Sequence, residues 1–173
     1  MGVMAPPGQR EPAGLAADPA PQPLALVGDE LAVTLNDARA ALEQYVEGDA
    51  GNAPLERCAA LLHTVRGVLQ ITETYGASLL AEEMEQACQA LLKGRRDAQP
   101  ADGIEALTRA AVQLPAYVDR IRHGGRDVPL VLLPLLNDLR AARGRPLLSE
   151  STLLLLNLGP AAGGPAVPPP RTP

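Results

Sequence analysis

Aromatic residues are nearly absent from this chain of 173 residues, which has three tyrosines and neither phenylalanine nor tryptophan. Nucleic-acid bases would therefore have almost nothing to stack on, and the net charge of −5 would repel phosphates. These two deficits exclude nucleic acid as a ligand. Apolar residues make up 46% of the chain and are mostly leucine, alanine and valine, which favour helices and are numerous enough for one core.

Cysteine is also scarce, because only Cys58 and Cys88 are present and they form no C-x-x-C motif. We expect both thiols to be reduced, as in a cytoplasmic protein. The sequence has no signal-peptide pattern and no apolar run of membrane-spanning length. A soluble cytoplasmic protein without membrane insertion is therefore predicted, in which the leucine run at 153–156 is a packing or docking patch.

Proline, alanine and glycine dominate both ends of the chain. Residues 1–27 are predicted to be a disordered tail, and residues 153–173 a Leu-rich segment followed by a Pro-rich linker. The helical bundle should occupy residues 28–152. Both a module of a longer polypeptide and a small free-standing protein with loose ends would show this pattern.

Apolar residues recur with helical spacing between the tails and predict five helices in an all-α, up-and-down bundle. Pro115 should kink or split the fourth helix, and the fifth is apolar nearly all round and should pack on two sides. The expected bounds are a cap at Asp29 to Gly48, Pro54 to Tyr75-Gly76, Gly76 to Gly94, about Ile104 to Gly124, and about 129–143.

His63 falls at the edge of the apolar stripe of the second helix and should reach solvent. A neutral imidazole has a lone pair that attacks phosphorus, and Arg66, one turn on, would neutralise the phosphate. Glycine inside a helix costs about 1 kcal/mol relative to alanine, so Gly67 calls for a reason. Its missing side chain would let a partner carrying an aspartyl phosphate approach His63 closely. The alternative is that His63 is an ordinary surface residue and Gly67 a close-packing point between helices.

The remaining motifs carry less chemistry. His123 beside Gly124-Gly125 is interpreted as a C-terminal cap, and the run Glu82–Glu85 as a docking surface for a basic partner or, more simply, a solvated face. The cysteines and histidines lack metal-ligand spacing, and no phosphate loop or nucleophile elbow is present. We therefore expect no cofactor, no metal and no autonomous catalysis.

Residues 62–69 resemble the core motif of histidine phosphotransfer (HPt) domains, in which lysine and glycine follow the histidine at +3 and +4; here Arg66 replaces the lysine. The runs 75–86, 133–144 and 147–150 are similar to the N-terminal HPt-like module of the CheA-like hybrid histidine kinases (ChpA/PilL type) of type IV pilus chemosensory systems, a module related to the FimL scaffold. The resemblance spans about residues 29–152.

This resemblance implies a phosphotransfer module in a two-component phosphorelay that controls type IV pili and twitching motility. His63 would be the phosphoacceptor, Arg66 its basic partner and Gly67 the residue that clears the approach. The implied partners are a histidine kinase core, receiver domains of response regulators and pilus-localisation scaffold proteins. The receiver domains would supply Mg²⁺. Recruitment to the cell pole is one option. The alternative is a degenerate HPt-like scaffold without phosphoryl transfer.

Overall fold

The structure is a computed structural model that describes residues 2, 23–94 and 99–157. These residues contain helices and no strand, which confirms the all-α fold class. Most of the predicted N-terminal tail, and residues 158–173 of the predicted linker, lie outside the described residues. The elements are α1 (Pro23–Glu47), α2 (Ala53–Ile71), α3 (Tyr75–Lys93), α4 (Pro100–Arg122), the 3-10 helix η1 (Pro129–Leu132), α5 (Leu133–Ala142) and α6 (Glu150–Asn157).

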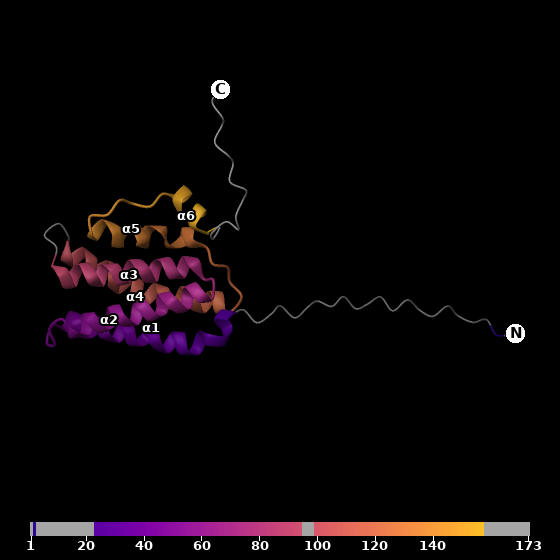
Figure 1. The fold of residues 1–173 in the computed structure, drawn as a ribbon, viewed down its shortest axis with the longest axis horizontal. Coiled ribbons are helices and arrows are strands. Elements are labelled where there is room, and N and C mark those ends of the chain that lie inside the picture. Colours follow the sequence, from indigo (N-terminus) through magenta and orange to yellow (C-terminus); the bar gives the residue numbers. More distant parts are fainter. Residues whose placement is uncertain (1, 3–22, 95–98, 158–173) are drawn as a thin grey trace, which may run out of the picture.

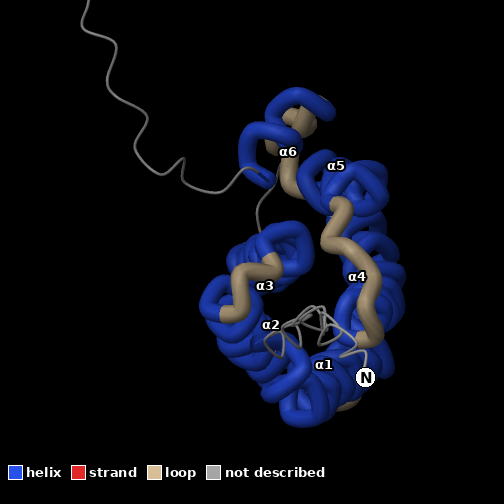
Figure 2. Tube along the Cα trace, turned by 90° about the vertical axis from the view of Figure 1, so that its right-hand side faces the viewer, coloured by secondary structure: helices blue, strands red, loops and turns tan. Residues whose placement is uncertain are grey.

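Helices α1 to α4 lie side by side with nearly parallel axes (Figure 1). Viewed along these axes, α2 packs between α1 and α3, and α4 closes the ring against α1 and α3 (Figure 2). Helix α5 covers α3 and α4 from outside, and α6 lies against η1 and α3. The predicted up-and-down bundle is confirmed, and α6 is a helix beyond the five that were predicted.

The core consists mostly of leucine and alanine, and Tyr117 is the buried aromatic residue in it. A fully buried leucine contributes roughly 1.5 to 3 kcal/mol of transfer free energy, so aliphatic side chains supply most of the stabilisation of this core. None of the described helices is long and apolar enough to span a bilayer. The largest fully buried side chains include Leu55, Leu62, Leu69, Leu80, Leu107, Leu114, Leu136 and Leu139.

Two predicted helix boundaries were wrong, and α4 begins at Pro100, one turn before the expected start near Ile104. Helix α1 begins at Pro23 rather than at Asp29, because Leu24 is buried and extends the apolar stripe by two turns. Asp29 is exposed and forms an ion pair with Arg122 of α4 instead of capping a helix. Helix α2 ends at Ile71, not at Tyr75-Gly76, because Glu73 adopts a left-handed conformation with φ of 58° that α-helix does not accept.

The C-terminal half differs from the expectations in two places. Pro115 does not split α4, which runs unbroken from Pro100 to Arg122 with Leu114 and Val118 buried on either side of the proline. The predicted fifth helix is instead η1 followed by α5. It does not pack on two sides throughout, because Leu130 and Val131 are 41% and 59% exposed.

Asp127, in the loop between α4 and η1, fixes the start of α3. Its carboxylate accepts a hydrogen bond from the Gly76 backbone N–H at 2.8 Å and another from the Tyr117 hydroxyl. Burial and the neighbouring Asp127 carboxylate raise the pKa of Tyr117. A side chain at position 76 would overlap the Asp127 carboxylate and approach the Pro129 ring to 2.9 Å, which explains why glycine stands there.

Candidate functional site

His63 lies in the middle of α2 with 65% of its side chain exposed, so the prediction that it reaches solvent is confirmed. Its Nδ1 atom is 2.9 Å from Oε1 of Glu85 on α3. A carboxylate accepts hydrogen bonds, so this contact favours a proton on Nδ1 and leaves the lone pair on Nε2. The ring is thereby oriented by the neighbouring helix, with Nε2 free of this contact.

Glu85 also faces Arg66. Its Oε2 atom, which has no hydrogen-bond partner, lies 3.4 Å from Nη1 of Arg66, a distance too long for a strong hydrogen bond. Both side chains are largely buried, at 15% and 27% exposure. A phosphate on His63 would therefore compete with Glu85 for the guanidinium of Arg66.

Sequence reasoning did not find Glu85 as the partner of His63. The contact joins residues on different helices, and the run around Glu85 was interpreted only by its charge. One signal was available: in two antiparallel helices joined by a short loop, residues roughly equidistant from that loop face each other, and this holds for His63 and Glu85 around the 72–74 turn.

Gly67 leaves open space one turn from His63. A Cβ atom added at this position would meet no atom within 4 Å. The alternative in which Gly67 is a close-packing point between helices is therefore wrong. Its role in clearing the approach of a partner stays a prediction.

The acidic run Glu82–Glu85 does not form a single charged surface. Glu83 is only 3% exposed, so for this residue the interpretations as a docking surface and as a solvated face are both wrong. Oε1 of Glu83 accepts a hydrogen bond from Nη1 of Arg140 at 2.7 Å, and Oε2 pairs with Nη2 of Arg143. Arg143 also donates to Oε1 of Gln86 at 2.8 Å. This ion cluster ties α3 to α5, so the runs 75–86 and 133–144 meet in space.

His123 occupies the C-cap position of α4, as predicted. Its Nδ1 atom lies 2.8 Å from the backbone oxygen of Asp119, and its side chain is 70% exposed. Within the described part of the chain, no group of three or more His, Cys, Asp or Glu side chains is arranged to hold a metal ion.

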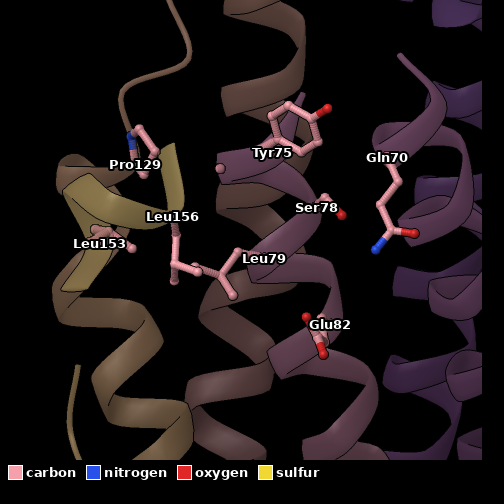
Figure 3. Close-up of a pocket in the computed structure, with 9 residues that line it drawn as sticks. Gln70, Tyr75, Ser78, Leu79, Glu82, Pro129, Leu153 and Leu156 are labelled. Atoms are coloured by element: carbon pink, nitrogen blue, oxygen red, sulfur yellow. The ribbon is translucent and has the colours of Figure 1, made fainter. Parts of the chain in front are cut away.

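A second candidate surface lies at η1 and α6. The side chain of Leu153 is buried, whereas Leu130, Val131 and Leu154 to Leu156 are exposed and form what we call the η1–α6 patch. Beside it, a hollow of about 330 Å³ separates α6 from α3, and Leu156 and Leu79 point toward each other across it (Figure 3). Exposed apolar patches of this kind mark interaction sites, so the run 153–156 both packs and presents a surface.

Asn137 of α5 holds the segment that leads to α6. Its amide accepts a hydrogen bond from the Leu148 N–H at 2.8 Å and donates one to the Leu148 carbonyl at 3.1 Å. Ser149 then caps α6, since its Oγ accepts the N–H of Thr152 at 3.2 Å. The patch is thus presented by a helix whose start is fixed by α5.

Comparison with known families places residues 21–133 in the family described as the FimL C-terminal domain. This chain belongs to that family. A relative with 35% identity over 131 residues is the scaffold protein FimL of Pseudomonas aeruginosa strain PAO1. The aligned region covers 74% of this chain but 23% of the relative, so the chain spans about a quarter of that protein's length. No solved structure matches this FimL C-terminal domain.

Proposed function

We propose that this FimL C-terminal domain is a protein-docking scaffold domain in the chemosensory pathway that controls type IV pili and twitching motility. The observation that carries this proposal is the η1–α6 patch on a domain whose relative is named a scaffold protein. The resemblance of the runs 75–86 and 133–144 to a module of chemosensory kinases supports the choice of pathway. Scaffolding needs neither a cofactor nor a catalytic centre.

The patch suits an amphipathic helix of a partner protein. The hollow is walled by apolar side chains that include Leu79, Pro129 and Leu156, and Gln70 and Glu82 lie at its polar edge (Figure 3). Apolar residues one turn apart on a partner helix would enter the hollow, and a lysine or arginine beside them would pair with Glu82. A histidine kinase or response regulator of the pathway would supply this helix.

A charge placed on the patch should weaken docking. We expect Leu156→Glu, at a side chain that is 51% exposed and lines the hollow, to weaken binding of the pathway's purified kinase at least roughly tenfold without unfolding the bundle. The affinity is measured by biolayer interferometry, and circular dichroism monitors the fold. Val33→Glu on the distant α1 surface, at 62% exposure, is the matched control and should bind like wild type. Equal affinity of both variants, or no binding by wild type to the kinase or regulators, would refute docking at this patch.

A second candidate function is phosphoacceptance by His63. The observation that favours it is the geometry of the ring, which is exposed, oriented by Glu85 and flanked by the open space at Gly67. Nε2 would attack the phosphorus of a receiver's aspartyl phosphate, the P–O bond to the aspartate would break and its carboxylate would leave, and Arg66 would share the charge added to His63. The receiver would supply the Mg²⁺ for this reaction.

Phosphoacceptance predicts that a phosphorylated receiver with Mg²⁺ transfers an acid-labile label to wild type but not to His63→Gln. We expect Glu85→Gln to slow labelling roughly tenfold, because the amide orients the ring without stabilising its developing positive charge. His123→Gln, on the exposed end of α4, is the control and should label normally. Label that survives in His63→Gln, or no label on wild type, would exclude this function and leave docking at the patch untouched.

A further inference from the structure

Neither proposed function uses the two cysteines, which face each other across the seam between α2 and α3. The Sγ atoms of Cys58 and Cys88 are 3.9 Å apart, and the residues are 2% and 0% exposed. Both thiols are free in the structure.

We propose that Cys58 and Cys88 are a redox modification site, at which hydrogen peroxide converts the free thiols into a reversible intrachain disulfide. The Cys58 thiolate attacks one peroxide oxygen, the O–O bond breaks, and the leaving hydroxide takes a proton to become water. The Cys88 sulfur then attacks the resulting sulfenic acid, which forms the S–S bond and releases a second water. Two thiols are oxidised and one peroxide is reduced to two waters.

The environment of the pair assigns these two roles. The Cys88 thiol donates to the Cys58 sulfur, and this contact lowers the pKa of Cys58 despite its burial. The same contact, burial and the nearby charges of Cys58 and Glu85 raise the pKa of Cys88. Cys58 is therefore the attacking thiolate and Cys88 the resolving thiol. Peroxide is small and uncharged, so a local opening of the seam is enough to admit it.

The disulfide would also fix the helices that position His63. An S–S bond is about 2.05 Å long, so the sulfurs have to approach by roughly 2 Å through side-chain rotation and a small shift of the helices. Cys88 lies one turn beyond Glu85 on α3, and Cys58 precedes His63 on α2. Oxidation would thus clamp the seam next to the His63–Glu85 contact.

The experiment treats the purified, fully reduced chain with hydrogen peroxide. We expect intact mass to fall by two hydrogen atoms, thiol titration in denaturant to fall from two groups to none, and tryptic mapping to recover a peptide that joins Cys58 to Cys88. The midpoint of thermal unfolding should rise by roughly 5 °C and return to its original value with dithiothreitol. Amide exchange in α2 and α3 should slow in the oxidised form.

Single variants test the pairing. Cys88→Ala should yield sulfenic acid trapped by dimedone at Cys58, whereas Cys58→Ala should react with peroxide at least roughly tenfold more slowly. The mass and the peptide map are obtained on wild type and so do not depend on either variant being stable. The proposal is overturned if wild type keeps two thiols, gains oxygen without losing hydrogen, or forms only disulfides between chains.

Discussion

Glu83→Ala should lower the free energy of unfolding by about 3 to 5 kcal/mol, the typical cost of removing one partner from a buried ion pair. Glu83 is 3% exposed and accepts from both Arg140 and Arg143, whose side chains are 22% and 8% exposed. Without the carboxylate, two guanidinium groups would remain in the α3–α5 interface with little access to water. Urea unfolding followed by circular dichroism measures the loss.

Two further variants distinguish a lost ion cluster from a lost side chain. Glu105→Ala removes an exposed glutamate of α4 and should change the stability by less than about 0.5 kcal/mol. Glu83→Leu combined with Arg143→Leu replaces a charged contact by an apolar one and should recover part of the loss, because no buried charge of that pair is left unpaired. If Glu83→Ala were as stable as wild type, the cluster would contribute nothing to the fold.

The second large effect is expected at Asp127, where alanine should lower the free energy of unfolding by about 2 to 4 kcal/mol. The Gly76 N–H and the Tyr117 hydroxyl both lose their acceptor, and an unsatisfied buried polar group costs about 1 to 3 kcal/mol. Thermal unfolding measures this change. Asp138→Ala is the matched control, since its ion pair with Arg109 is about half exposed and should contribute less than about 1 kcal/mol.

An ultraviolet titration of the tyrosines gives an independent readout for Asp127. Burial is the main cause of the raised pKa of Tyr117, and the hydrogen bond and charge of Asp127 add to it. In Asp127→Ala the Tyr117 pKa should therefore fall toward its ordinary value without reaching it. A titration curve unchanged from wild type would show that the carboxylate does not act on this hydroxyl.

The fold class and the exposure of His63 were predictable because both follow from the spacing of apolar residues along one helix. The limits of helices were less predictable where tertiary contacts decide them. Leu24 belongs to the core beside Ile121 of α4 and the 72–74 turn, and Pro115 stands inside α4 between the buried Leu114 and Val118. Local propensity carries no information about such contacts.

The chemistry between helices was the least predictable part. Glu83 and Glu85 stand two positions apart in one acidic run, yet one turns toward α5 and the other toward α2. The sequence alone led to the interpretation of both residues as surface charge. Only the helices that pack against α3 show which carboxylate has a cation beside it. The proximity of Cys58 and Cys88 was not predicted either, because the two residues are distant in sequence and adjacent only in the folded chain.

The Glu83 cluster also sets a minimum length for a folding unit. The family match ends at residue 133, but both arginines that neutralise Glu83 lie beyond that point, on and just after α5. A fragment cut at residue 133 would lack both counter-ions of Glu83 and would expose the side of α3 and α4 that α5 covers. Expression trials and deletion strains that truncate the chain at residue 133 would then report misfolding rather than loss of function. A truncated chain should instead end after Asn157.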